Sequence, residues 1–243
     1  MANLGKGSIS PIARHPAARV FEEDTGDALA GLDMAGLETV FRGGKRKSFA
    51  AKQIIFREGD PADTVAAIVQ GLVKLISYSP DGRARIVRLH AKCAFLGLGG
   101  LIEPTYQHTA VAVDQVEVIC APLRTIAQLK KDNPYLYCRL IECWYQHLKS
   151  ADIWITDFST GSIKARVARL VNFLAAIQND TSTSTAVTLL TCEEMAAILG
   201  VTVESVSRVL AEFKRSRMLR AIKCKPAKRY ETNIPALKHV AQI

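Results

Sequence analysis

The stretch from Thr191 to Arg215 constrains the fold of this chain more than any other, because it predicts two short helices joined by a tight turn. Thr191 and Glu194 have the three-residue spacing of a capping box, which starts a helix. Gly200 can adopt the positive φ that ends this first helix, and Thr202 can cap the second one. Apolar residues recur at threes and fours in both helices, so each has a face for a core. The stretch therefore predicts a helix-turn-helix of the DNA-reading kind.

The second predicted helix carries a polar stripe that includes Glu204, Ser207 and Arg208. Arg208 can donate two hydrogen bonds to guanine O6 and N7, Glu204 can accept one from cytosine N4, and Ser207 is short enough for a thymine edge. Two core helices of an unrelated bundle are the alternative, but such helices rarely combine a capping box, a glycine turn and this stripe. The predicted DNA-binding residues are Thr202, Val203, Glu204, Ser205, Ser207 and Arg208.

The basic residues are concentrated in the C-terminal third of the chain. The 243 residues have a formal net charge of +9, and from Gly161 onward 13 Lys and Arg stand against 6 Asp and Glu, a balance of +7. Such a surface fits the phosphate backbone of double-stranded DNA. The sequence has no apolar run of about 18 residues and no signal-peptide core. We therefore expect a cytoplasmic protein with no membrane partner, whose six cysteines are thiols.

Short β segments separated by turn residues fill the region from about Lys47 to Ala121. Their spacing predicts a small antiparallel β-roll or barrel. The predicted strands are Gln53–Phe56, Val65–Val69, Val73–Tyr78, Ala84–Leu89, Thr109–Val113 and Val116–Ala121. Before this region we expect a loosely ordered arm over residues 1–30 and a short helix over Met34–Phe41.

A long helix is predicted to start at Asn133-Pro134, because proline is favoured at the first helical position. Its apolar residues recur at threes and fours, which predicts a two-stranded coiled coil with a second copy of the chain. The alternative is a single helix lying on its own β-roll. The residues of this stripe are Leu136, Leu140, Cys143 or Trp144, His147 or Leu148, Ala151 and Ile155.

The C-terminal region continues from a predicted hinge over Ser159–Ser162 into an amphipathic helix over Ile163–Ala176. A polar loop over Asn179–Thr185 precedes the helix-turn-helix. Segments Met218–Ile222 and Arg229–Thr232 can pair as a hairpin with the basic tip 223–228, as in a DNA-binding wing. The predicted domains are an arm at 1–30, a β-roll sensor domain at 31–131, a dimerisation helix and hinge at 132–160, and a winged helix-turn-helix domain at 161–243.

Together these parts resemble the CRP/FNR superfamily of bacterial transcription regulators from about Leu37 to Val240. The resemblance implies an α+β fold with an N-terminal cyclic-nucleotide-binding-like β-roll, a long dimerisation helix and a C-terminal winged helix-turn-helix. The motifs that carry it are Ile55-x-x-Glu58-Gly59-Asp60, Val69-x-Gly71-x-Val73-Lys74, Phe95-Leu96-Gly97, Asn133-Pro134 and Val203-Glu204-Ser205-Val206-Ser207-Arg208.

The Glu-x-x-Ser-Arg pattern from Glu204 to Arg208 resembles the FNR and FixK-like branch of that superfamily. This resemblance implies a homodimer that binds a TTGAT/ATCAA-like palindrome and contacts RNA polymerase. The cyclic AMP branch has a further arginine where this chain has Val203, so contact there should shift towards apolar.

The sequence indicates the signal that the protein senses less clearly than it indicates the DNA-reading helix. Relatives that bind cyclic AMP carry a glutamate for the ribose and an arginine for the phosphate, where this chain has Leu98 and His108. Leucine cannot accept a hydrogen bond, and neutral histidine replaces a guanidinium poorly, so we expect no cyclic AMP dependence. The pocket either serves another ligand or is filled by side chains. Its candidate residues are Gly97, Leu98, His108 and Thr109.

Cofactor chemistry is constrained by the cysteines and histidines. Cys120 resembles the β-domain ligand of FNR-type iron–sulfur clusters, but no cysteine precedes Cys93, so we expect no such cluster and no dedicated metal site. Haem remains open, with His90, His108 and His147 as candidate ligands.

Cys192 and Cys120 are the candidates for redox control, with Cys192 at a helix N-terminus that favours a thiolate. The alternative to a homodimeric, sequence-specific DNA-binding regulator is thus a redox- or gas-sensing module, using a thiol or haem, whose DNA binding is switched by that input. The sequence carries no P-loop, nucleophile elbow or zinc-protease motif, so we do not expect an enzyme.

Overall fold

The computed structural model describes residues 40–41, 43–179, 186–222 and 229–242. The predicted arm, most of the helix predicted over Met34–Phe41, most of the polar loop and the basic hairpin tip lie outside these residues. Among the helices that are described, none has the length and hydropathy of a membrane span.

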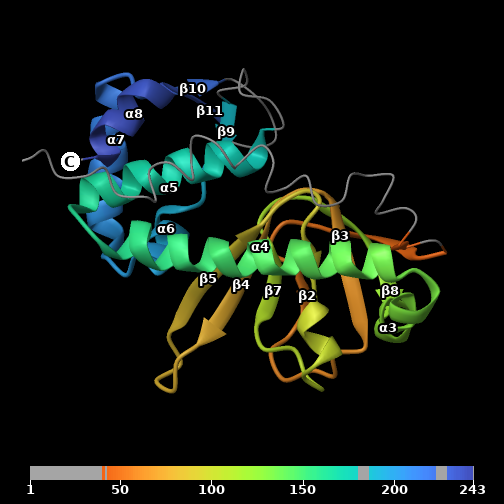
Figure 1. Ribbon diagram of the computed structural model, residues 1–243. Coiled ribbons are helices and arrows are strands. Elements are labelled where there is room, and N and C mark those ends of the chain that lie inside the picture. Colours follow the sequence, from red (N-terminus) through yellow and green to blue (C-terminus); the bar gives the residue numbers. More distant parts are fainter. Residues whose placement is uncertain (1–39, 42, 180–185, 223–228, 243) are drawn as a thin grey trace, which may run out of the picture.

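The N-terminal part is a roll of two antiparallel four-stranded sheets, ordered β1-β8-β3-β6 and β2-β7-β4-β5 (Figure 1). All six predicted strands are confirmed within one residue at each end, and β1 and β6 are additional. The strands are β1 Lys45–Phe49, β2 Ile54–Phe56, β3 Thr64–Gln70, β4 Val73–Tyr78, β5 Ala84–His90, β6 Phe95–Leu96, β7 Thr109–Ala112 and β8 Val116–Pro122.

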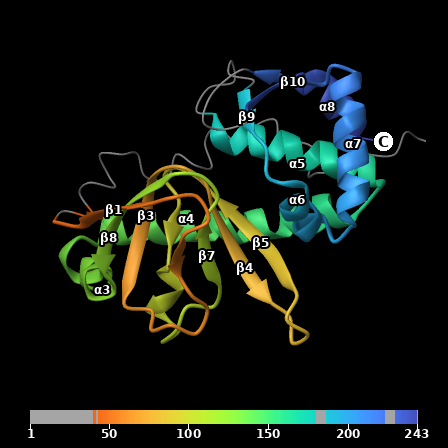
Figure 2. The same ribbon diagram turned by 180° about the vertical axis from the view of Figure 1, so that it is seen from behind.

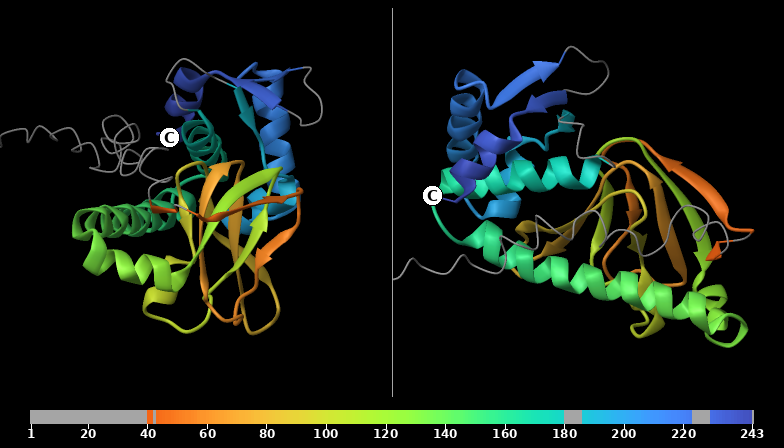
Figure 3. Two further views of the ribbon diagram at one scale, coloured as in Figure 1. Left: turned by 90° about the vertical axis from the view of Figure 1, so that its right-hand side faces the viewer. Right: turned by 45° about the horizontal axis from the view of Figure 1, so that its top comes forward.

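Three helical segments complete this part: the short 3-10 helix η1 (Leu98–Leu101), α3 (Leu123–Asp132) and α4 (Pro134–Ser159). The start of α4 is confirmed, because the Asn133 side chain accepts a hydrogen bond from the Leu136 backbone N–H at 3.1 Å. Helix α4 lies along one side of the roll (Figures 1 and 3).

The first turns of α4 pack on the roll of the same chain. Leu136 and Leu140 are buried in a cluster with Ile126 of α3 and Phe95 of β6. The prediction that these two leucines face a second copy was therefore wrong, because their own roll already covers them. Further along α4, Ile155 stays exposed.

The C-terminal part packs helices around a three-stranded sheet ordered β10-β11-β9. The predicted hairpin is confirmed, with Leu219 opposite Thr232 in antiparallel register. The strand β9 and the last helix are additions to the sequence prediction. The elements are α5 Ile163–Gln178, β9 Ala186–Thr188, α6 Cys192–Leu199, α7 Val203–Arg215, β10 Leu219–Ile222, β11 Arg229–Thr232 and α8 Ile234–Ala241.

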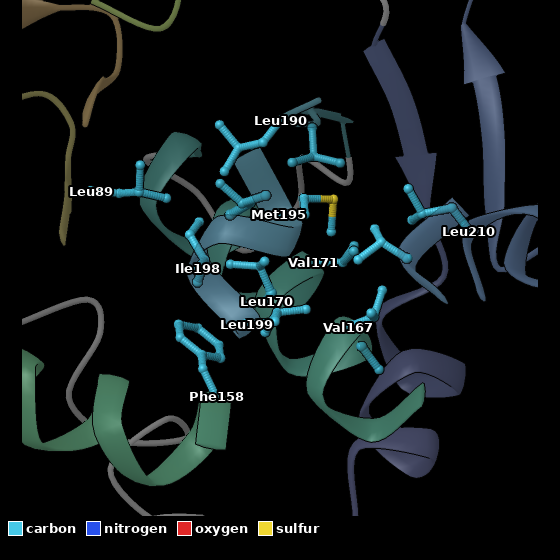
Figure 4. Packing of buried hydrophobic residues seen from close by; sticks show 14 of the residues in the cluster. Leu89, Phe158, Val167, Leu170, Val171, Leu190, Met195, Ile198, Leu199 and Leu210 are labelled. Atoms are coloured by element: carbon cyan, nitrogen blue, oxygen red, sulfur yellow. The ribbon is translucent and has the colours of Figure 1, made fainter. Parts of the chain in front are cut away.

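The two parts share one hydrophobic core, which is the largest cluster of buried residues in the described chain. Helix α6 lies beside β5 (Figure 2), and the outer face of the β4–β5 hairpin is buried against it. Figure 4 shows Leu89 of the roll and Phe158 of α4 on the same side of this cluster as Ile198. The roll contributes Leu72, Ile76, Ile86, Leu89 and Val111.

An ion pair crosses the same contact. The Lys74 ammonium of β4 lies 2.5 Å from Glu194 Oε1 of α6, and the two side chains are only 13% and 17% exposed. At this degree of burial, removing either partner would leave the other charge largely buried and unpaired, which is strongly unfavourable. The DNA-reading part is therefore held to the roll by both apolar packing and charge.

The helix break between α4 and α5 falls at the predicted hinge, and two arginines brace it. Arg169 donates from Nη1 to the carbonyls of Asp157 at 3.0 Å and Thr160 at 2.7 Å, and from Nε to Ala241 at 2.9 Å. Arg166 donates from Nε to the Phe158 carbonyl at 2.7 Å and also reaches the last carbonyl of α6. These guanidinium groups satisfy carbonyls that helix ends leave without partners.

Candidate nucleic-acid interface and sensor cavity

Helix α6 begins with the capping box that the sequence predicts. Thr191 Oγ1 accepts from the Glu194 N–H at 3.2 Å, and Glu194 Oε2 accepts from the Thr191 N–H at 2.9 Å. Gly200 ends the helix with φ of +62°, and its N–H donates to the Ala196 carbonyl at 2.8 Å. The predicted capping box and the predicted glycine turn are therefore both confirmed, and the turn fixes where α7 starts.

Helix α7 is held by its apolar face and by Thr202 at its N-cap. Thr202 Oγ1 accepts from the Ser205 N–H at 3.3 Å, and the buried face is Val206, Leu210 and Phe213. Its first turn holds Glu204 and its last turn holds Lys214 and Arg215, which suits the helix dipole. The face opposite this core is left to solvent.

The six predicted DNA-binding residues fall into two groups. Glu204, Ser207 and Arg208 are exposed, and none of them has a side-chain hydrogen bond or ion pair within the described ranges. Thr202 and Ser205 instead share a hydroxyl contact at 3.0 Å, and Val203 packs partly against the shared core. The first group has the free donors and acceptors that base edges require, whereas the second group shapes the start of α7.

Basic side chains that the sequence prediction did not single out surround the C-terminal end of α7. Lys214, Arg215, Arg217 and Arg220 are all exposed there. Lys214 Nζ lies 5.0 Å from the centre of the Tyr230 ring, and Arg220 Nη1 lies 3.7 Å from Glu231 Oε2. The available signal in the sequence was that these four basic residues lie close to one another.

A cavity of about 220 Å³ opens inside the roll beside η1. Three of the four predicted effector residues, Gly97, Leu98 and His108, line it. Gly97 has φ of +83°, and a Cβ there would lie 2.6 Å from the Thr64 carbonyl oxygen, so only glycine fits. Thr109 lies elsewhere: it is buried, and its Oγ1 accepts from the Glu58 N–H at 3.1 Å.

The sequence prediction missed two residues that line the same cavity, Arg88 of β5 and Trp144 of α4. Burial lowers the pKa of Arg88, and burial together with the Arg88 charge lowers the pKa of His108. His108 is therefore mainly neutral at neutral pH. Strict alternation along β5 would place Arg88 on the same face as Ile86, so the sequence offered no signal: the register shift between Leu75 and Ile76 is what separates the two residues.

The cofactor and redox candidates occupy different surroundings. His90 is buried and lines the cavity, whereas the side chain of His147 lies outside the described residues. In the part of the chain that is described, no three His, Cys, Asp or Glu residues are grouped as a metal site would need. Cys120 is buried and its pKa is raised by burial, which disfavours a reactive thiolate. Cys192 is partly buried against the shared core.

A β-roll with an internal cavity, joined by one long helix to a helix-turn-helix, defines a class of protein: a DNA-binding regulator with a separate β-roll domain. Residues 46–133 match the cyclic nucleotide-binding domain family, and residues 166–238 match the Crp-like helix-turn-helix domain family. The chain belongs to the CRP/FNR superfamily of transcription regulators. Members of this family are transcription regulators rather than enzymes.

The curated relatives are of the same kind. The transcriptional activator protein FnrL of Cereibacter sphaeroides is 27% identical over 179 residues, covering 71% of each chain. A probable transcriptional activator of Rhizobium leguminosarum bv. viciae is 28% identical over 191 residues, covering 78% of this chain and 79% of its own.

Solved structures share the fold. FixK2 from Bradyrhizobium japonicum superposes with a TM-score of 0.70 at 20% identity, covering 81% of this chain and 96% of its own. A transcriptional regulator of the CRP family from Thermus thermophilus has a TM-score of 0.68 at 27% identity, covering 81% of this chain and 97% of its own.

Proposed function

We propose that this regulator is a cytoplasmic, homodimeric activator that reads a TTGAT/ATCAA-like palindrome through Glu204, Ser207 and Arg208 and contacts RNA polymerase. The observation that carries the proposal is the outward stripe of α7. Glu204 and Arg208 are one helical turn apart, yet no ion pair joins them in the described structure. Each therefore keeps its full hydrogen-bonding capacity for a base edge.

Phosphate contacts complement this base readout. The exposed Arg215 and Arg217 lie at the end of α7, and the basic hairpin follows directly. Contacts to phosphates set the register of a helix in the major groove but carry no sequence information. We therefore assign specificity to the stripe and sequence-independent affinity to these cations.

A second copy would pack on a stripe of α4 that keeps Ile155 of the predicted stripe but leaves Leu136 and Leu140 to the roll. Cys138, Ile141, Tyr145, Asp152 and Ile155 have the alternating spacing of threes and fours of a coiled-coil seam, apart from position 148, whose side chain is not described. Tyr145 is 58% exposed and Ile155 is 66% exposed, which is unusual for large apolar side chains. We call these five residues the α4 seam, and the exposure of its large apolar side chains supports the dimer.

Binding to a TTGAT/ATCAA duplex and to a scrambled duplex, measured by fluorescence anisotropy at fixed salt, tests the DNA reading. Arg208→Ala should lose about 1–3 kcal/mol of preference, roughly 5- to 150-fold, because a bidentate pair to guanine disappears. The matched control Arg217→Ala should weaken binding to both duplexes alike. An Arg208→Ala protein with the wild-type preference would refute the assignment.

A further inference from the structure

An arginine of the roll reaches the turn of the helix-turn-helix. Arg85 lies near the start of β5, opposite Ser77 in the β4–β5 hairpin, and is exposed. Helix α6 packs beside this strand (Figure 2), which brings the turn at Gly200 close to it. A Cβ built on Gly200 would lie 3.3 Å from Arg85 Nη2, so the guanidinium lies directly against this exposed turn. A cation of the N-terminal part therefore lies beside the start of the DNA-reading part.

The charge of Arg85 is not used by any contact within the described chain. Two other basic residues of the same hairpin have acid partners: Lys74 pairs with Glu194 at 2.5 Å, and Arg83 pairs with Asp81 at 3.1 Å. Arg85 has neither an ion pair nor a hydrogen bond among the residues that the structure describes. Its guanidinium therefore keeps all of its N–H donors for a partner outside the chain.

The end of α6 does not need Arg85 as a cap. The Leu199 carbonyl accepts from Arg166, and the Ala196 carbonyl accepts from the Gly200 N–H at 2.8 Å. These two bonds satisfy carbonyl groups that the end of a helix leaves without partners. The position of Arg85 against the turn is therefore not explained by the hydrogen bonding of α6.

The position of this turn indicates what the partner is. Two residues after Gly200, Thr202 caps α7, and Glu204 lies in the first turn of that helix. When a helix-turn-helix is docked on DNA, the N-terminal residues of its second helix meet base edges while its first helix crosses the sugar–phosphate backbone. The turn that joins the two helices therefore runs close to the phosphates at the edge of the major groove. An arginine at this turn is complementary to a phosphate in charge, and its planar fork can donate two parallel hydrogen bonds to it.

We propose that Arg85 binds a DNA phosphate at the edge of the major groove that α7 enters, so that the roll takes part in DNA binding directly. The surface that contacts DNA then continues from α7 across the Gly200 turn onto the β4–β5 hairpin. The contact adds affinity but no sequence preference, because the phosphate is the same at every base pair. The inference rests on the placement of α7 in the major groove, but it does not depend on which bases that helix reads.

The salt dependence of DNA binding tests this contact. The Kd is measured by fluorescence anisotropy on the TTGAT/ATCAA duplex and on the scrambled duplex, from about 50 to about 200 mM salt. Each phosphate that a cation neutralises contributes about 0.9 to the slope of log K against log salt concentration. Arg85→Met should therefore reduce the slope by about 0.9 for each copy bound, and by the same amount on both duplexes. The preference between the two duplexes should stay at the parent value.

Two further variants of the same hairpin serve as controls. Arg83→Met removes the same kind of charge, but from a side chain that already pairs with Asp81, so it should keep the slope of the parent. Arg85→Lys keeps a positive charge at the turn and should keep most of the slope. Because both arginines are exposed, all three variants should keep the Tm of the parent, which separates loss of the contact from loss of the fold.

Methylphosphonate substitution removes the charge of one phosphate at a time and locates the contact on the DNA. The parent should bind more weakly when the phosphate that faces Arg85 is neutral, whereas Arg85→Met should not respond to that substitution. A slope for Arg85→Met equal to that of Arg83→Met, or the same methylphosphonate profile for Arg85→Met and the parent, would overturn the proposal. Equal affinity of the parent for the two duplexes would instead refute the proposed base reading, and it would leave the comparison of slopes valid.

Discussion

Glu194 serves two parts of the molecule with its two carboxylate oxygens. Oε2 accepts the capping hydrogen bond of α6, and Oε1 meets the Lys74 ammonium of the roll. The local capping box could be predicted from a three-residue spacing. The ion pair joins residues 120 positions apart, so no local pattern could indicate it.

Glu194→Gln should separate these two roles, because an amide oxygen can still accept the capping bond but carries no charge. We expect the free energy of unfolding to fall by about 1–3 kcal/mol through loss of the buried pair. Glu194→Ala should lose about 1 kcal/mol more, since the cap also disappears. Urea denaturation measures both. In a double-mutant cycle with Lys74→Met, additive effects would contradict a direct pair.

His108 makes stability depend on pH. Its pKa is lowered from the ordinary value of 6.5 by burial and by the Arg88 charge, with Glu58 opposing. A histidine that is neutral in the folded state contributes stability at pH values above its unfolded pKa. This contribution is lost as the pH falls through the lowered pKa of the folded state. Urea midpoints from about pH 7.5 to about pH 5.5 should therefore fall, and less so in His108→Gln. Identical pH profiles for the two proteins would exclude His108 as the source.

At the scale of the element, α4 divides its surface between its own roll and the second copy that we propose. Leu136 and Leu140 pack on the roll of their own chain, while all residues of the α4 seam except the partly buried Ile141 are exposed. Apolar periodicity indicated the helix correctly, but it did not indicate which stripe of the helix is covered by the roll of the same chain. That choice depends on α3, which escaped prediction because it has no side-chain cap and Ile126 is its one fully buried residue.

Asp152 lies in the α4 seam, where it would meet its own counterpart across a two-fold axis. Asp152→Asn should tighten the dimer about two- to fivefold, because a like-charge contact disappears. Tyr145→Asp should do the opposite. Sedimentation equilibrium measures the dissociation constant, and the gain from Asp152→Asn should shrink at high salt. Weaker association of Asp152→Asn would place this residue outside the interface.

At the scale of the whole molecule, the sequence predicted the order of parts and the local turns. It did not predict the shared core. An apolar strand face is found in any roll, so the apolar outward face of the β4–β5 hairpin did not indicate that another part of the chain covers it. Ile76 and Ile86 are cross-strand partners on this face, and both are buried against the C-terminal part. Their partner, α6, lies more than a hundred positions away from them.

A fragment ending at residue 160 should therefore fold poorly on its own. It would expose the face of Ile76 and Ile86, and we expect it to bind the dye ANS and to self-associate. The same fragment with Ile76→Lys and Ile86→Lys should lose both properties. A monomeric fragment that does not bind ANS would show that the roll folds without the C-terminal part packed against it.

The shared core also affects how the chain is made. The last strand of the roll ends at Pro122, but α6, which covers the β4–β5 hairpin, ends at Leu199. At about 5–20 residues per second, a ribosome needs roughly 4–15 s to synthesise the intervening stretch. During that interval the nascent roll presents a bare apolar sheet face, which is a surface that chaperones bind. The contact that joins the sensor to the DNA reader in the finished protein thus sets a period of vulnerability during its synthesis.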